Sequence, residues 1–229
     1  MIRVLVVGEG PHDVGTKHPT APGWLDTFLR RFGDVEIETI GRSAIVLSPA
    51  ASRRSRPLPE GHGAKALAAK LKATIEGFDV VVFMADADSP EERRWRWHHA
   101  RIWDGFSRIT DGPKTVSCLP MAASESWLLA DAEAWRAIGL EDGSCLPRRP
   151  EEIWGKRDDP DGGHPHRFFA RVCDEADVPD DRETRVALAE RSDRRVLHDR
   201  APFSFGAFWA ELVAAGIAEP MTIGSSSSV

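Results

Sequence analysis

The chain has 229 residues, of which 41% are hydrophobic and 29% are charged, and its formal net charge is −6. This composition is ordinary for a soluble globular protein and excludes a disordered chain. The length is sufficient for one folding unit with a full hydrophobic core. The negative net charge excludes a surface that is basic throughout, as in proteins coated uniformly for nucleic-acid binding.

The charge is unevenly distributed along the chain, because the segment 42–72 holds seven basic residues and a single acid, Glu60. The basic residues are Arg42, Arg53, Arg54, Arg56, Lys65, Lys70 and Lys72. A local basic surface can bind phosphate groups although the whole protein is acidic. A solvated helix face joined to a loop explains the same pattern, and both interpretations stay open.

Cysteine usage and hydropathy indicate where the protein resides. Cys118, Cys145 and Cys173 are odd in number and lack C-x-x-C spacing, so neither a disulfide framework nor a zinc knuckle is indicated. The apolar run at 2–7 is too short for a signal peptide or a membrane span, and no later run reaches the required length. We therefore expect a cytoplasmic protein without a membrane partner.

The first elements expected in chain order alternate between strands and a helix. Residues 2–7 are a β-branched run that ends in a Gly-Glu-Gly-Pro turn, which is typical of a buried strand. Residues 24–32 have apolar side chains at helical spacing. Short strands are expected at 35–40 and 44–47, and a loop rich in Ser, Pro and Arg follows at 48–61.

The next helix is expected at 64–76, where Leu67, Leu71 and Ile75 lie on one side. Gly77 follows directly after this segment. Glycine at that place is a common helix stop signal, because it adopts the left-handed conformation without steric cost.

The strongest strand pattern in the sequence covers residues 79–85 and delivers Asp86 and Asp88 at its carboxyl end. A helix at 90–107 and a strand at 114–119 follow it. Alternation of strands and helices predicts an α/β fold, in which helices flank a mostly parallel central sheet.

The second half of the chain is expected to be helical and rich in loops. Helices are expected at 124–130, from the cap residue Asp131 to Ile138, at 166–176 and at 205–215. The expected organisation is an α/β core at 1–138, a C-terminal elaboration packed on that core at 139–221, and a disordered tail at 222–229.

Four acidic residues follow two of the expected strands: Glu9 and Asp13 after the first, and Asp86 and Asp88 after the strand at 79–85. In open parallel sheets, functional groups collect beyond the carboxyl ends of strands. If the two strands are neighbours, the carboxylates repel one another unless some are protonated or a divalent cation binds. Oxygen ligands suit Mg²⁺ or Mn²⁺ and therefore phosphate chemistry. D-x-D after a strand is also common as a turn former and helix cap.

The motif G-E-G-P-H-D at 8–13, followed by a strand ending in D-A-D at 86–88, resembles the TOPRIM fold. That fold serves topoisomerases, bacterial primases and overcoming-lysogenization-defect (OLD) nucleases. The resemblance implies a Rossmann-like sheet and an Mg²⁺ or Mn²⁺ site, in which Glu9, Asp86 and Asp88 are catalytic metal ligands. It implies Asp13 as a further ligand, as in OLD-type nucleases.

A second motif, E-S-W-L-L-A-D at 125–131, resembles the E-x-W-L-L-A-D signature of an uncharacterised TOPRIM-like bacterial family. The resemblance spans about 2–138 and implies that Glu125 completes the catalytic and metal-binding set. Relatives often sit beside a gene for an ABC-type ATPase, which implies such a partner in phage defence. From the residues alone, Trp127 to Leu129 are expected to face the core and Asp131 to cap a helix.

Several basic residues are candidates for binding substrate phosphate. Arg94, Arg101 and Arg108 recur at seven-residue spacing, which places them on one face of a helix and makes a nucleic-acid track an option. We select Arg94, Arg101 and Lys156 as candidates. An exposed amphipathic helix and a solvated lysine explain the same residues. His164 and His166 lie in a Gly/Pro loop without an obvious third ligand, so no zinc is assigned.

These patterns favour a metal-dependent nuclease that hydrolyses phosphodiester bonds of DNA or RNA. The alternative from another class is a catalytically silent TOPRIM-like subunit that binds nucleic acid or an ATPase partner. A sugar-nucleotide transferase or a phosphatase also uses D-x-D, but neither explains Glu9 or the motif at Glu125. The choice of nucleic acid, the mode of cleavage and the oligomeric state stay open, with a homodimer among the alternatives.

Overall fold

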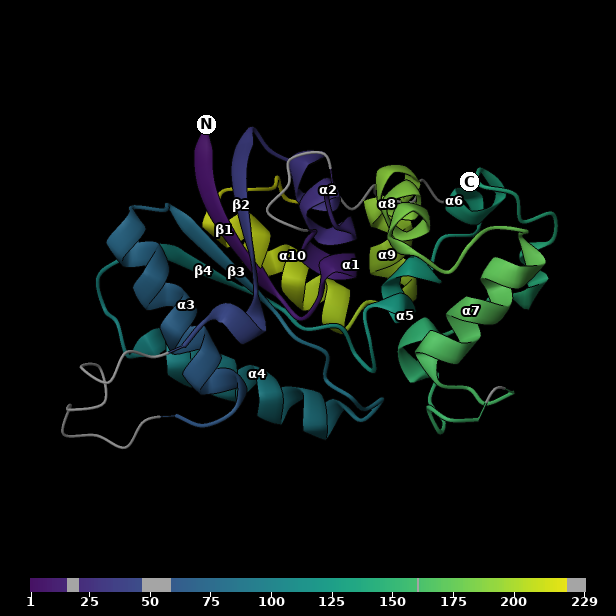
Figure 1. The fold of residues 1–229 in the computed structure, drawn as a ribbon, viewed down its shortest axis with the longest axis horizontal. Helices are drawn as coiled ribbons and strands as arrows, with labels where there is room; N and C mark the ends of the chain where they lie inside the picture. The colour runs from purple at the N-terminus through teal and green to yellow at the C-terminus, as the bar shows by residue number, and fades with distance from the viewer. Residues whose placement is uncertain (16–20, 47–58, 160, 222–229) are drawn as a thin grey trace, which may run out of the picture.

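The computed structural model describes residues 1–15, 21–46, 59–159 and 161–221. In these residues the centre of the fold is a sheet of four parallel strands in the order β2-β1-β3-β4 (Figure 1). The strands are β1 at Ile2–Gly8, β2 at Val35–Gly41, β3 at Val80–Met84 and β4 at Lys114–Cys118. The predicted α/β fold with a parallel central sheet is confirmed. Most of the loop expected at 48–61, and all of the tail expected at 222–229, lie outside the described residues.

Residues 4–8 of β1 and all of β3 are buried, which explains the apolar runs in these two central strands. They pair in parallel from Val4 with Val80 to Val7 with Phe83. Every residue of β3 is buried. The side chains alternate between the two faces of the sheet, so each central strand contributes to two separate cores.

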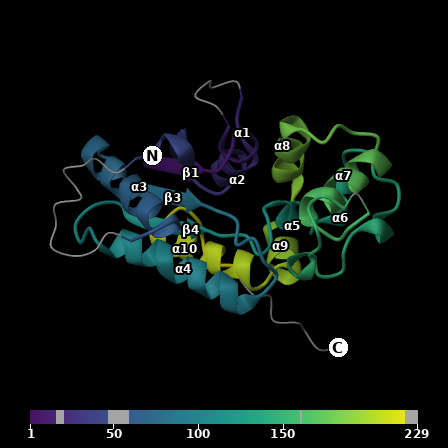
Figure 2. The same ribbon diagram turned by 60° about the horizontal axis from the view of Figure 1, so that its bottom comes forward.

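Helices cover both faces of the sheet (Figures 1 and 2). On one face, α3 (His62–Glu76) and α4 (Glu92–Ser107) pack against side chains of β1 and β3 such as Leu5 and Phe83. On the other face, α2 (Trp24–Arg30) and α10 (Ser204–Ala215) share the larger core.

Beyond the carboxyl ends of the strands lies a group of C-terminal helices (Figure 1). They are α5 (Glu125–Leu128), α6 (Ala132–Arg136), α7 (Pro165–Glu175), α8 (Arg182–Arg191) and α9 (Arg194–Arg200). Short turns complete the description: α1 (Pro11–Val14) and the 3₁₀ turns η1 (Arg42–Ala44), η3 (Gly143–Cys145) and η4 (Pro150–Glu152). The ring of Trp127 in α5 lies 5.3 Å from that of Phe205 in α10, so these helices share the larger core with the sheet.

One local expectation was wrong. No strand forms at the described residues 44–46: Ala44 ends the 3₁₀ turn η1, and the carbonyl of Ile45 accepts a hydrogen bond from Lys65 Nζ rather than from a neighbouring strand. In α3, Leu67 is buried but Ile75 is 75% exposed, and most of the buried stripe is formed by alanines such as Ala66, Ala69 and Ala73.

Small residues are needed on α3 because it packs very closely against α4. A Cβ atom added to Gly105 would lie 2.1 Å from the carbonyl oxygen of Gly63. The two helix backbones therefore touch near the start of α3, and bulkier side chains are directed away from the contact.

The helices α8 and α9 were not expected from the sequence. Their sequences are rich in arginine and acidic residues and have weak apolar periodicity, so the pattern gives little signal. Asp181 and Asp193 cap their first turns by accepting hydrogen bonds from backbone N–H groups. Within the described part of the chain, none of the helices combines the length and apolar character required to cross a lipid bilayer.

Candidate functional site

The structure brings Glu9 and Asp86 together at the carboxyl edge of the sheet. Glu9 follows directly after β1 and Asp86 lies two residues beyond β3, and these strands are neighbours. Burial raises the pKa of Glu9, and the charge of Arg42 and a hydrogen bond from the backbone N–H of Asp86 only partly oppose it. Repulsion from Asp88 and Asp13 raises that pKa further.

Asp86 is the electrostatic centre of this edge. Its Oδ1 atom is buried and has no hydrogen-bond partner among the described residues. Burial raises the pKa of Asp86 well above its ordinary value, and the charges of four other carboxylates add to that effect. These are Glu125, Asp13, Glu9 and Asp88. The five acidic residues singled out in the sequence therefore share one electrostatic neighbourhood.

Asp88 is exposed and has a backbone φ of +48°, in the left-handed region that non-glycine residues seldom adopt. Its backbone N–H donates to the carbonyl of Ala122 at 3.1 Å, and the N–H of Ala122 donates to the carbonyl of Ser89 at 2.9 Å. The turn after β3 is thus fastened to the loop after β4. These hydrogen bonds hold the loop that leads to Glu125, three residues after Ala122, next to the Asp88 turn.

Asp13 and Ser124 connect the first and last motifs. The Oδ1 atom of Asp13 accepts a hydrogen bond from Trp24 Nε1 at 3.0 Å and one from Ser124 Oγ at 3.3 Å. Burial raises the pKa of Asp13, and these two donors only partly oppose it. Asp13 is therefore held in place by neutral donors.

Glu125 is buried but has two polar partners, one of them the permanently charged Arg185. Its Oε1 atom lies 2.8 Å from His166 Nδ1 and 3.0 Å from Nη2 of Arg185, while Oε2 has a longer contact of 3.5 Å to Ser124 Oγ. Burial alone would raise the pKa of Glu125, but His166 and Arg185 outweigh burial and lower that pKa to about 2. Glu125 is therefore ionised.

Arg185 is itself anchored from several sides. It is 6% exposed, its Nη1 atom lies 2.6 Å from Asp180 Oδ1, and its guanidinium lies 4.4 Å from the ring centroid of Phe169. His166 stacks on His164 at 5.1 Å. The C-terminal helices thus supply the groups that neutralise Glu125.

Arg42 plays the corresponding part for Glu9. Its Nη1 atom lies 2.5 Å from Glu9 Oε1 and 3.1 Å from His62 Nδ1. Arg42 comes directly after β2, which is the neighbour of β1 in the sheet. Three adjacent strands therefore deliver charged groups to the same edge.

Other residues singled out in the sequence lie elsewhere. Arg101 lines a separate cavity on α4 and Arg94 lines another one, while Lys156 is exposed in the loop before α7. Asp131 caps α6 through Glu133 and Ala134 N–H groups, as predicted. Trp127, Leu128 and Leu129 are buried in the core, also as predicted.

Three residues at this edge were missed by the sequence interpretation: Arg42, His166 and Arg185. Arg42 had been noted only as part of a basic segment, although its place at the end of a strand was a usable signal. His166 had been noted without a partner. Arg185 lies on α8, an unexpected helix, so no sequence signal pointed to it.

The carboxylate edge has a donor set that suits a hard divalent cation. Among the described residues, no three His, Cys, Asp or Glu side chains, as they lie, form a group that could hold a metal ion. The fit rests on the chemistry of the donors: the unpartnered Oδ1 of Asp86, the exposed carboxylate of Asp88 and the weakly engaged Oε2 of Glu125. An added positive charge would relieve the repulsion that raises the Asp86 pKa.

Comparison of the chain with protein-family models, with curated proteins and with solved structures finds no match.

We predict that Asp86→Asn stabilises the protein against unfolding in EDTA at pH 7. The raised pKa means that the folded state resists ionisation of Asp86 while the unfolded state does not. This cost is absent at low pH and grows as pH rises through the unfolded-state pKa toward the folded-state value. Urea unfolding should therefore show an advantage for the variant that shrinks as pH falls toward 4. Asp88→Asn, at the exposed end of the motif, should gain less stability. If Asp86→Asn destabilised the protein at pH 7, the raised pKa of Asp86 would be contradicted.

Glu125→Gln should have the opposite effect and destabilise the protein by about 2 to 4 kcal/mol at pH 7, because Arg185 then loses a buried charged partner. The lowered Glu125 pKa contributes stability above about pH 4.5, and this contribution is lost as pH falls toward about 2. The difference in the free energy of unfolding between variant and wild type, measured with urea, should therefore become smaller as pH falls from about 4.5 toward about 2. Glu133→Gln, in an exposed pair with Arg136, is the matched control and should change little. An equal loss in both variants would sink the prediction.

Proposed function

We propose that the protein is a cytoplasmic nuclease that hydrolyses phosphodiester bonds of nucleic acid with Mg²⁺ or Mn²⁺ at the carboxylate edge. The observation that carries the proposal is the buried, unpartnered Oδ1 of Asp86 amid four further carboxylates. Retaining so many like charges in one place is costly unless a cation is bound for part of the time. The resemblance of the motifs at 8–13, 86–88 and 125–131 to TOPRIM proteins supports the same function.

The residues that would hold the ion are Glu9, Asp86 and Asp88, with Asp13 and Glu125 beside them. A divalent ion bound there supplies Lewis-acid polarisation of the phosphodiester and stabilises the charge that develops on its oxygens. Glu9 can serve as a ligand if Arg42 moves to a substrate phosphate, because the guanidinium already lies between Glu9 and the neighbouring basic cavity.

His166 is placed to handle a proton in the reaction. Glu125 binds its Nδ1 atom and so fixes the orientation of the ring, which leaves Nε2 for exchange of a proton with water or the leaving oxygen. Arg185 in turn fixes Glu125. In this arrangement Glu125 and Arg185 are positioning residues, and His166 is the candidate general acid or base.

A second candidate function is a catalytically silent subunit that binds nucleic acid or an ABC-type ATPase partner. One observation favours it: Glu9 and Glu125 already have arginine partners, Arg42 and Arg185, which balance part of the negative charge without a metal. The nuclease is preferred because Asp86 and Asp88 have no such partner among the described residues. In either case we propose that the protein acts with an ABC-type ATPase partner in phage defence.

The test is a nuclease assay of the full chain with Mn²⁺ on single- and double-stranded DNA and RNA, alone and with any ABC-type ATPase that is encoded beside it. We expect cleavage that Asp88→Asn lowers roughly 100-fold or more, because a metal ligand is lost. Asparagine tolerates the left-handed conformation at position 88, so the turn should be preserved. Asp111→Asn, an exposed carboxylate on another loop, is the control and should keep full activity.

A second measurement separates loss of chemistry from loss of fold. Mn²⁺ should raise the melting temperature of the wild type, and this increase should be smaller in Asp88→Asn and Asp86→Asn. Absence of cleavage in every condition, together with absence of Mn²⁺ stabilisation, would favour the silent subunit. Cleavage that survives Asp88→Asn unchanged would refute the proposed site.

A further inference from the structure

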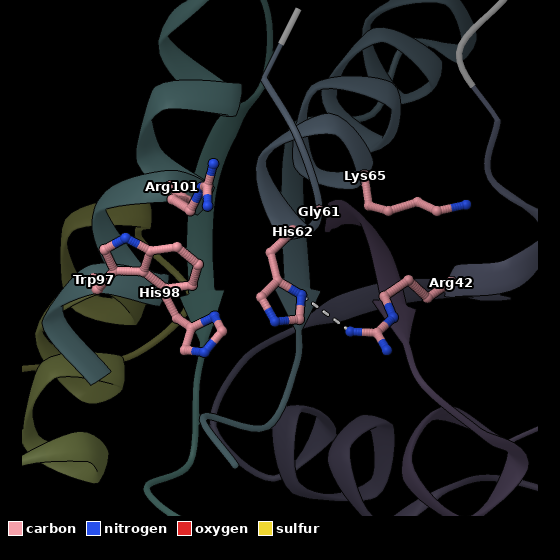
Figure 3. Close-up of a pocket in the computed structure, with 7 residues that line it drawn as sticks. All are labelled: Arg42, Gly61, His62, Lys65, Trp97, His98 and Arg101. Carbon is pink, nitrogen blue, oxygen red and sulfur yellow. Dashed lines mark hydrogen bonds between the residues drawn. The ribbon is translucent and has the colours of Figure 1, made fainter. Parts of the chain in front are cut away.

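A cavity of about 340 Å³ lies between the start of α3 and one face of α4 (Figure 3). Its lining includes three permanent cations, two histidines and one tryptophan: Arg42, Lys65, Arg101, His62, His98 and Trp97. Residues from α3 and the turn after β2 face residues from α4 across the cavity (Figure 3). The close contact of the two helices at Gly63 and Gly105 fixes this arrangement.

The cavity is basic although the protein is acidic overall. The opposing carboxylates are Glu9, which pairs with Arg42, and Glu60, which is 88% exposed and lies 3.9 Å from Arg101. Lys65 donates to the backbone carbonyl of Ile45 and has no carboxylate partner among the described residues. The cavity therefore has an excess of positive charge that an anion can neutralise.

His98 provides an independent sign of a ligand. It is 7% exposed, and neither of its ring nitrogens has a hydrogen-bond partner among the described residues. Its ring lies 4.8 Å from that of His62 across the cavity. A buried imidazole without any partner is costly, and an acceptor oxygen in the cavity would satisfy it. Burial lowers the pKa of both histidines, to about 4 for His62, so the positive charge comes from Arg42, Lys65 and Arg101.

Trp97 lines both this cavity and a second basic hollow. It is 52% exposed and its ring stacks under the Arg101 guanidinium at 4.4 Å. The second hollow, of about 340 Å³, is lined by Glu91, Arg93, Arg94 and Trp97. An exposed aromatic ring that borders two basic hollows can bind successive nucleotides, because bases stack on the ring while phosphates lie in the hollows.

Arg42 links the lining of the cavity to the carboxylate edge, because its guanidinium contacts both His62 and Glu9. We propose that the cavity and the hollow beyond Trp97 bind a single-stranded segment of nucleic acid, with one phosphate among Arg42, Lys65 and Arg101 and a base on Trp97. This strand site rests on the proposed function, which supplies the class of substrate. It adds where the strand lies and that the strand is unpaired. Arg42 would then place the next phosphate beside Glu9.

Fluorescence anisotropy of a labelled oligothymidine of about 12 nucleotides, in EDTA and with the full chain, tests this directly. The double variant Trp97→Ala with Arg101→Ala should bind at least about tenfold more weakly, and Trp97→Phe should keep most of the affinity because any aromatic ring can stack. The matched controls are Trp103, on the same helix, and Arg108, directly after its last residue. Trp103→Ala removes another exposed tryptophan and Arg108→Ala an arginine paired with Asp104, and both should bind as the wild type does.

The outcomes distinguish this proposal from the proposed function. Asp88→Asn should bind the oligonucleotide with wild-type affinity while it fails to cleave. Absence of binding by the wild type, unchanged binding in the double variant, or equal loss in the Trp103 control would overturn the strand site, even if cleavage occurs. Competition by thymidine monophosphate as strong as by the oligonucleotide would also overturn it, because the cavity would then bind free nucleotides. Binding through Trp97 without any cleavage would retain the strand site and refute the nuclease.

Discussion

The parallel pairing of β1 with β3 is the constraint on which the site depends, because it places the residues after both strands at one edge of the sheet. Glu9 and Asp86 therefore lie close together in this topology. The turn containing Asp88 is fastened by backbone hydrogen bonds to the loop that leads to Glu125, so the third acidic motif joins the same edge. The carboxylates at this edge repel one another, and together with burial this repulsion raises the pKa of Asp86 well above its ordinary value.

The rest of the chain distributes counterions around this edge unequally. The C-terminal helices supply Arg185 and His166 to Glu125, and the turn after β2 supplies Arg42 to Glu9. Asp86 is left with a buried oxygen that has no partner in the described structure. The C-terminal elaboration therefore completes the site as well as the core. A cation at Asp86 would balance the negative charge of the carboxylates. A phosphate near Arg42 would balance the positive charge of the basic cavity.

The sequence predicted the sheet and the acidic edge better than the counterions, and the physical reason is locality. Strand patterns such as that of β3, and acids placed directly after strands, are local signals that survive in a single sequence. Arg185 reaches Glu125 across 60 positions from a helix with weak periodicity, so only the folded chain shows the pair. The exposure of Ile75 on α3 is likewise visible only in the folded chain, because the close approach of α4 selects small residues such as alanine on the contact face.

We propose that a divalent cation binds at the carboxylate edge. Diffraction from crystals of the full chain soaked in Mn²⁺, recorded where manganese scatters anomalously, is the decisive measurement. We expect an anomalous peak in contact with Asp86 and at least one of Glu9 and Asp88, and loss of that peak in Asp86→Asn crystals. An edge without a peak at saturating Mn²⁺, or a peak bound only elsewhere on the protein, would rule out a metal site at this edge.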